Sequence, residues 1–232
     1  MDAAKSQITK LVVCYPGRFQ PCGLHHATTF KMLKARFDGI GGDTYMVTSN
    51  KVELPKSPFN FDEKQSIINA HGIKEVVQVK SPYMASELLN RYDSETTAVL
   101  YAVGEKDMSV NPRFKAGLKK NGKPTYYQHY GGNENNLQPY TKHAYLVIAP
   151  HVDIQIPGIG EMSGTALRNV LSKAAEETFA TIMGFTNKKI YDMIKSKLSG
   201  AANKFRKKNK KKTKKKKKHK KKTKRNKKTK RI

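Results

Sequence analysis

The sequence predicts an α/β fold in which helices cover both faces of a parallel β-sheet. Strand-like apolar runs alternate with short helical segments from residue 8 to residue 198. Several of these runs are apolar throughout, as is typical of strands that are buried on both faces. The first run ends in a Gly/Pro turn that leads directly into a helical pattern, so the chain opens with a β-loop-α unit.

The elements follow one another in the order that a parallel sheet requires. Strands are predicted over residues 8–15, 43–49, 75–79, 98–103 and 144–148, and helices over residues 25–37, 61–70, 85–92, about 174–183 and 187–198. The helix over residues 61–70 has an N-cap at Asn60, with Glu63 three residues on. A further helix begins at Gly164, and a turn is expected at Gly158-Ile159-Gly160.

Two segments depart from this alternation. Residues 109–143 are rich in Lys, Gly, Asn and Tyr and have little periodicity, so we expect a long insertion or lid over the sheet edge. Residues 201–232 are almost only Lys, Arg, Thr and Asn, and such a segment cannot bury enough apolar area to offset the entropy of ordering. The chain is therefore expected to consist of one folded domain over residues 1–200 and a disordered polybasic tail over residues 201–232.

Charge is distributed unevenly over the 232 residues. The net charge is +28, but residues 201–232 hold 21 of the 46 basic residues and none of the 18 acidic ones, which leaves +7 for residues 1–200. No apolar stretch approaches the roughly 18 residues of a membrane span. No secretory signal is recognised either, so we expect a cytoplasmic protein with no membrane partner.

The two cysteines, Cys14 and Cys22, lie in or beside the first predicted strand. A disulfide between them would close little chain, and two thiols eight residues apart are weak evidence for metal. We expect two reduced thiols, with Cys14 buried and Cys22 near the pocket, and no metal-ligand set in the protein.

The loop after the first strand carries chemistry that suits a phosphate. It reads Gly17-Arg18-Phe19-Gln20-Pro21, and it is followed by Gly23 and by the paired imidazoles of His25 and His26. A strand-loop-helix of this kind presents backbone N–H groups, a cation and a helix N-terminus to one anion. Ligands of parallel sheets bind at the carboxyl ends of the strands, which is where this loop and residues 104–107 fall.

A second motif follows some 140 residues later, at Met162-Ser163-Gly164-Thr165-Ala166-Leu167-Arg168. The Ser163 hydroxyl, the N–H groups near Gly164 and Thr165, and the Arg168 guanidinium one turn along are expected to point toward the same end of a helix. With the first loop, this motif resembles the HxGH-type nucleotidyltransferase superfamily, and most of all the nicotinamide mononucleotide adenylyltransferases, over roughly residues 8–200.

The resemblance implies a Rossmann-like domain that binds ATP and magnesium. A phosphorylated acceptor attacks the α-phosphorus, pyrophosphate leaves, and no covalent enzyme intermediate forms. By this resemblance His26 stabilises the transition state, Ser163, Thr165 and Arg168 bind the β- and γ-phosphates, and the protein is expected to be able to form oligomers. Arg18 is either a second phosphate cation or a structural clamp on the turn.

The further nucleotide-binding candidates are Gly17, Phe19, Gln20, His25 and Gly164 in the two motifs, and Gly104 and Asp107 after the fourth strand. Lys64 lies where relatives often carry an Arg near the acceptor. The motif is not matched throughout, because Gly23 stands where the superfamily carries a His or a Thr and His25 stands where it carries Gly. Either His25 takes over the missing phosphate contact, or catalysis is weakened.

The sequence leaves other functions open. The same chemistry serves cytidylyl transfer to an alcohol phosphate and adenylyl transfer to pantetheine phosphate. A catalytically degenerate nucleotide-binding domain is also possible, tethered to nucleic acid by the Lys-rich tail, which would neutralise many phosphates without reading sequence. The tail fits a targeting signal or a dispensable extension equally well.

Overall fold

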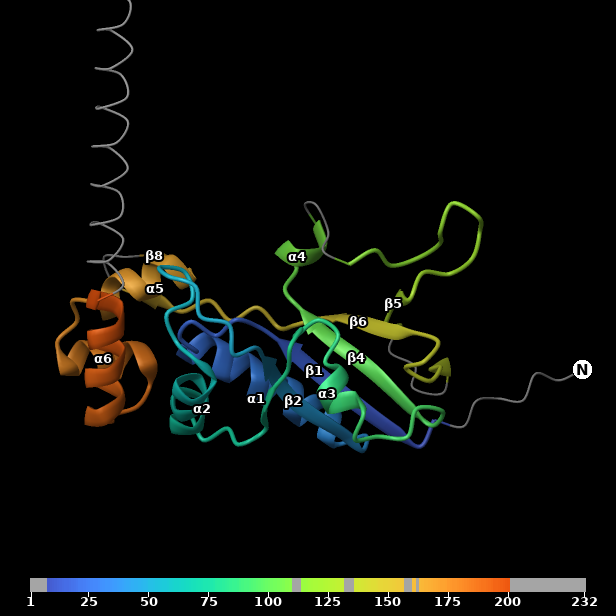
Figure 1. Cartoon of the computed structure of the whole chain (residues 1–232), viewed down its shortest axis with the longest axis horizontal. Coiled ribbons are helices and arrows are strands. Elements are labelled where there is room, and N and C mark those ends of the chain that lie inside the picture. The colour runs from blue at the N-terminus through green and yellow to red at the C-terminus, as the bar shows by residue number, and fades with distance from the viewer. Residues whose placement is uncertain (1–7, 110–113, 132–135, 157–159, 162, 201–232) are drawn as a thin grey trace, which may run out of the picture.

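The computed structural model describes residues 8–109, 114–131, 136–156, 160–161 and 163–200 (Figure 1). Its centre is a six-stranded, all-parallel sheet with the order β3-β2-β1-β4-β6-β5. The strands are β1 (Lys10–Pro16), β2 (Gly42–Thr48), β3 (Val76–Gln78), β4 (Thr97–Val103), β5 (Tyr127–His129) and β6 (Ala144–Ile148). The predicted α/β, Rossmann-like fold is confirmed.

Helices connect these strands and follow the last of them. They are α1 (Leu24–Asp38), α2 (Phe61–Ala70), α3 (Ser86–Leu89), α4 (Lys106–Ser109), α5 (Gly164–Leu171), α6 (Glu176–Met183) and a final helix over residues 188–200. A small antiparallel hairpin of β7 (Gln155–Ile156) and β8 (Gly160–Glu161) precedes α5. None of the helices described here is long and apolar enough to cross a membrane.

Alternate residues of β1 enter different apolar clusters, which shows that both faces of the sheet are covered. Leu11 and Val13 pack with Leu33 and Phe37 of α1. Val12 and Cys14, which point to the other face, share a cluster with Leu88 and Leu89 of α3. This burial on both sides explains why β1 and β4 are apolar throughout.

The predicted start of α2 is confirmed in atomic detail. Asn60 Oδ1 accepts the Glu63 amide N–H at 2.9 Å, and Glu63 Oε2 accepts the Asn60 amide N–H at 2.9 Å. This reciprocal pair satisfies two amides that a helix start would otherwise leave unpaired. The helix spans the predicted residues.

Other elements differ from the prediction. The helix expected over residues 85–92 is only one turn long, and it follows Ala85, whose φ is 48°. The expected insertion contains β5, so the strand at residues 144–148 is the sixth and not the fifth. The turn expected at residues 158–160 lies outside the described residues except for Gly160, as does the whole tail. Cys14 and Cys22 are both buried, unpaired thiols.

Candidate functional site

A cavity of about 740 Å³ lies at the carboxyl ends of β1, β4 and β6. From β1 the chain first adds β2 and β3 on one side of the sheet and then crosses to the other side, where the strands lie in the spatial order β4, β6, β5. Such a change of direction opens a crevice between neighbouring strands, where ligands of α/β sheets bind. The cavity is lined by Tyr15, His25, His26, Thr29, Gly104, Glu105, Lys106, Ile148, Ala149, Pro150, His151, Val152, Asp153 and Ile154.

Gly17 and Phe19 give the first loop its shape. A Cβ built on Gly17 would lie 2.6 Å from Cζ of Phe19, so no larger residue fits there without moving the ring. Phe19 has a left-handed backbone with φ of 45°, and its buried ring packs 5.6 Å from Tyr15 and 5.4 Å from His26 between centroids. Phe19 is therefore a wedge that holds His26, and not a surface on which a base stacks.

Gln20 uses its side chain to hold the loop rather than to face the cavity. Its Nε2 donates to the Phe59 carbonyl at 2.8 Å, and its Oε1 accepts the Phe59 amide N–H at 2.8 Å. The side chain is only 6% exposed. The Gln20 carbonyl accepts from Arg168, so this residue joins the loop to two distant segments.

His26 lies in the first turn of α1 as a neutral imidazole. Its Nδ1 accepts the Gly23 amide N–H at 3.2 Å, so the ring proton is on Nε2. Burial, followed by the neighbouring His25 and His71, lowers the pKa of His26 well below its usual 6.5. The ring lines the cavity, and its polar N–H is a donor for an acceptor that enters there.

The His25 ring takes the space beside Gly23. A Cβ on Gly23 would lie 3.0 Å from Cε1 and 3.1 Å from Nδ1 of His25, and 3.0 Å from Cδ2 of Leu167. The two imidazole centroids of His25 and His26 are 3.9 Å apart. His25 Nδ1 is buried without a hydrogen-bond partner in the described structure, and burial lowers the pKa of His25 to about 4, with smaller effects from His71 and His151.

The second motif meets the first loop through Arg168. Arg168 Nη1 donates to the Gln20 carbonyl at 3.1 Å, and Nη2 donates to Thr165 Oγ1 at 3.2 Å. Ser163 caps α5, because its Oγ accepts the Ala166 amide N–H at 3.2 Å. The structure thus brings two segments together that lie 148 residues apart.

Two guanidinium groups lie near each other in this region. Burial, and then the positive charge of exposed Arg18, lowers the pKa of Arg168. In the part of the chain that the structure describes, neither Arg18 nor Arg168 forms an ion pair with a carboxylate. Like charges held together without a counterion are an arrangement that an anionic ligand stabilises.

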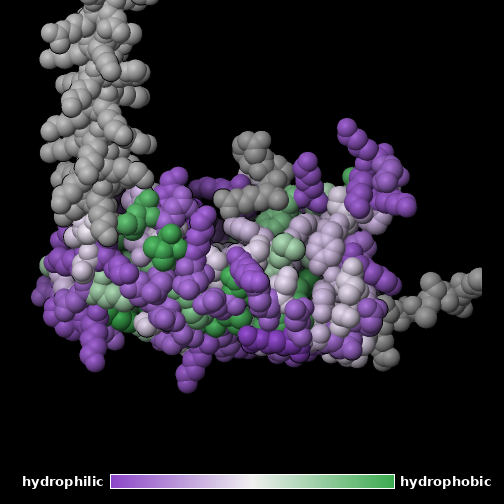
Figure 2. Space-filling model, in the orientation of Figure 1, coloured by the Kyte–Doolittle hydropathy of each residue, from purple (hydrophilic) through white to green (hydrophobic). Residues whose placement is uncertain are grey.

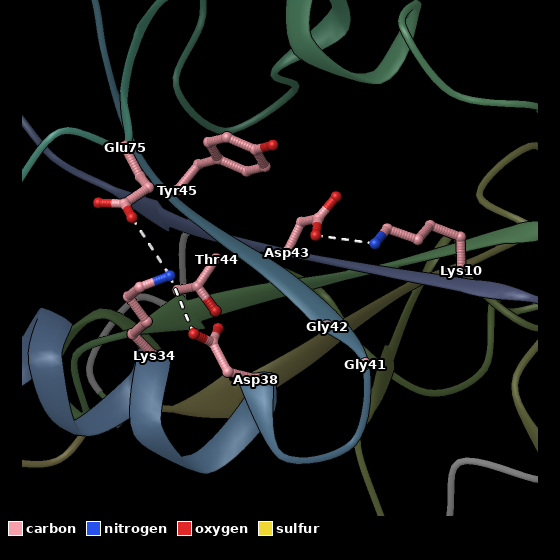
Figure 3. Close-up of a pocket in the computed structure, with 9 residues that line it drawn as sticks. All are labelled: Lys10, Lys34, Asp38, Gly41, Gly42, Asp43, Thr44, Tyr45 and Glu75. Carbon is pink, nitrogen blue, oxygen red and sulfur yellow. Dashed lines mark ion pairs between the residues drawn. The ribbon is translucent and has the colours of Figure 1, made fainter.

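The opposite ends of the strands form a contrasting pocket of about 370 Å³ (Figure 3). There Lys10 pairs with Asp43 at 2.7 Å, and Lys34 pairs with Asp38 at 2.9 Å and with Glu75 at 3.2 Å. The lysines at this end are therefore neutralised by carboxylates, in contrast to Arg18 and Arg168, which have no carboxylate partner among the described residues.

The remaining predicted site residues differ in how close they lie to the cavity. Gly104 lines the cavity. Asp107 is not one of the lining residues, and its amide donates to the Gly104 carbonyl at 2.9 Å. Lys64 is only 1% exposed, and its Nζ donates to Thr48 Oγ1 at 3.1 Å and to the Ser49 carbonyl. Burial lowers its pKa to about 8. The structure does not bring Lys64 to the cavity, because position 64 lies on the apolar side of α2 with Ile67 and Ile68.

Several lining residues escaped the sequence prediction. Thr29 of α1 donates its hydroxyl to the Pro150 carbonyl at 3.1 Å, which ties the segment after β6 to the helix that carries both histidines. His151 and Asp153 follow β6, and Glu105 follows β4 within residues 104–107, which were expected at the site although Glu105 itself was not singled out. Their position just after the ends of two predicted strands was the available signal.

The chain matches no protein-family model, and no curated protein is significantly similar to it. Its function must therefore be inferred from the fold, from the cavity at the carboxyl ends of the strands with the neutral imidazoles that line it, and from Arg18 and Arg168 at the loop after β1.

Proposed function

We propose that this protein is a nucleotidyltransferase that transfers AMP from ATP to a small phosphorylated acceptor, with release of pyrophosphate. Nicotinamide mononucleotide is the first candidate acceptor. One observation carries the proposal: neutral His26, with its proton on Nε2, lies in the first turn of α1, just after the loop to which Arg168 is hydrogen-bonded through the Gln20 carbonyl. Neither Arg168 nor Arg18 has a carboxylate partner among the described residues. Such a set of donors fits a polyphosphate.

In the proposed reaction one P–O bond forms and one P–O bond breaks. An oxygen of the acceptor phosphate attacks the α-phosphorus of ATP, the bond from the α-phosphorus to the bridging oxygen breaks, and pyrophosphate leaves with that electron pair. Negative charge builds on the α-phosphate oxygens, where the His26 N–H donates. Arg18 and Arg168 neutralise the departing phosphates, and the Arg168 fork is oriented by its two existing hydrogen bonds.

His25 supplies the phosphate contact that Gly23 cannot make. Its ring fills the space that a side chain at position 23 would enter, and its buried Nδ1 has no partner in the described structure. The ring reaches this place from the first turn of α1 without a distorted backbone, since His25 has helical conformation and is not among the residues with positive φ. The exchange of residue types between positions 23 and 25 is therefore compatible with an active site.

Magnesium fits this site as a companion of the nucleotide. Among the described residues no group of three or more His, Cys, Asp or Glu side chains is arranged to hold a metal ion. Mg²⁺ is commonly held by substrate phosphates, waters and one or two carboxylates, and the carboxylates that line the cavity belong to Glu105 and Asp153. When bound, the ion neutralises the charge of the triphosphate.

A pyrophosphate-release assay tests the proposal with ATP, nicotinamide mononucleotide and Mg²⁺. We expect release by the full chain, a loss of at least about 100-fold for His26→Ala, and no change for His129→Ala, whose side chain is exposed on β5. Equal rates for the two variants would refute the role of His26.

The same assay distinguishes the proposed function from the alternative functions. Release with CTP but not with ATP would replace adenylyl by cytidylyl transfer, and release only with pantetheine phosphate would change the acceptor. ATP binding without turnover on any acceptor would identify a degenerate nucleotide-binding domain, for which nucleic acid held by the Lys-rich tail becomes the relevant partner.

A further inference from the structure

A narrow hairpin extends from the sheet edge beside β5 (Figure 1). We call residues 115–126 the lysine arm. Its base is fixed by aromatic packing, because the Phe114 and Tyr127 rings lie 4.9 Å apart and the Phe114 and Tyr83 rings lie 5.4 Å apart between centroids. The arm therefore projects from a well-packed support.

Backbone hydrogen bonds hold the arm in one shape. The Lys119 amide donates to the Lys123 carbonyl at 2.7 Å, and the Thr125 amide donates to the Gly117 carbonyl at 2.8 Å. Gly117 and Gly122 have φ values of 107° and 76°, a conformation that glycine adopts without strain. A surface that is ordered before binding loses less entropy when a ligand arrives.

The arm is strongly and uniformly positive. Four lysines lie on it, and all four are exposed: Lys115, Lys119, Lys120 and Lys123. Residues 114–131 contain no Asp or Glu. None of the four lysines pairs with a carboxylate of the described structure, in contrast to Lys10 and Lys34 of Figure 3. In Figure 2 hydrophilic side chains gather where the arm leaves the body.

Two less polar side chains accompany these charges. Leu118 is 72% exposed and Tyr126 is 40% exposed, so the arm offers a flat ring and an aliphatic surface next to its cations. Proteins that bind single strands combine a basic track with side chains on which bases stack. One leucine and one tyrosine do not form the broad apolar face by which amphipathic segments enter a membrane.

We propose that the lysine arm binds single-stranded nucleic acid through its phosphate backbone. Lys119, Lys120 and Lys123 contact successive phosphates, and the Tyr126 ring and Leu118 receive bases. This site is part of the folded domain and is separate from the tail, and it does not depend on nucleotidyl transfer. The binding is not selective for sequence, because lysines that contact phosphates carry no base information.

The dependence of affinity on salt tests this proposal in the full chain, because each phosphate contact adds its own increment to that dependence. Fluorescence anisotropy with a labelled oligonucleotide of about 20 nucleotides is measured between about 50 and 300 mM salt. The test variant carries Lys119→Gln, Lys120→Gln and Lys123→Gln. The matched control carries Lys80→Gln, Lys173→Gln and Lys189→Gln, which removes the same charge at three exposed lysines elsewhere.

We expect the slope of log affinity against log salt to become shallower by about 2 in the arm variant, since each single-strand phosphate contact contributes about 0.7. The control is expected to keep the slope of the unmodified chain. Equal slopes for the two variants would overturn the proposal. So would a loss of binding to anionic phospholipid vesicles with oligonucleotide binding unchanged, which would assign the arm to a membrane surface.

Discussion

Replacement of Gly17 by Ala tests how the first loop holds the His26 imidazole, for which we propose a catalytic role. The new Cβ would lie 2.6 Å from Cζ and 2.7 Å from Cε1 of Phe19, whereas ordinary contacts begin near 3.4 Å. The ring must therefore move by about 0.8 Å. Phe19 is only 3% exposed and lies between Tyr15 and His26, so it cannot move without displacing a neighbour.

Overpacking of this kind costs about 1–3 kcal/mol of folding free energy. Displacement of a catalytic group by about 1 Å reduces rates by about 100-fold. We expect Gly17→Ala to show both effects, measured by urea unfolding and by pyrophosphate release. Gly39→Ala is the matched control, because Gly39 has φ of −62° and no atom within 4 Å of its added Cβ. A Gly17→Ala protein as stable and as active as this control would refute the wedge role of Phe19.

Three further predictions concern the Gln20 side chain, the Arg168 guanidinium and the buried histidines. Gln20→Ala leaves the buried amide and carbonyl of Phe59 unpaired, so we expect urea unfolding to show a loss of about 2–4 kcal/mol, against no loss for exposed Gln78→Ala. Arg168→Lys keeps the charge but not the fork, and calorimetry should show ATP affinity reduced by about tenfold or more; unchanged affinity would exclude Arg168 from the nucleotide site. Burial lowers the folded-state pKa values of three histidines below 6.5, namely His25, His26 and His71. The unfolded chain then binds more protons, so the free energy of unfolding should fall as pH decreases from 6.5 toward 4, by about 1.4 kcal/mol per pH unit for each proton taken up. A pH-independent free energy of unfolding over this range would contradict the burial of these rings.

The fold could be predicted where burial left a pattern in the sequence. Strands β1 and β4 are apolar because both of their faces are covered, and the Asn60 cap marks the start of α2. Strand β5 left no such pattern. It is three residues long, and the packing of Tyr127 against Tyr101 and Phe114 fixes its place at the edge. Contacts between distant residues decide such a strand, and local periodicity cannot reveal them.

The position of the candidate site could be predicted from the sequence better than the role of each residue in it. The loop after β1 and the start of α5 were expected to meet, and Arg168 joins them. Gln20 and Lys64 were expected to contact ligands, but their polar groups are held by Phe59, Thr48 and Ser49. A sequence does not show which polar side chains are used inside the protein, because their partners lie up to 39 residues away. The packing of His25 beside Gly23 likewise depends on side-chain positions that spacing does not determine.

The most direct measurement is ³¹P NMR of ATP, Mg²⁺ and nicotinamide mononucleotide incubated with the full chain. This experiment shows which phosphorus is attacked. Pyrophosphate and a new diphosphate linkage to the acceptor should appear together and in equal amounts, and neither should appear with His26→Ala. Formation of ADP or orthophosphate instead would place the attack on the γ-phosphorus and contradict nucleotidyl transfer at this site.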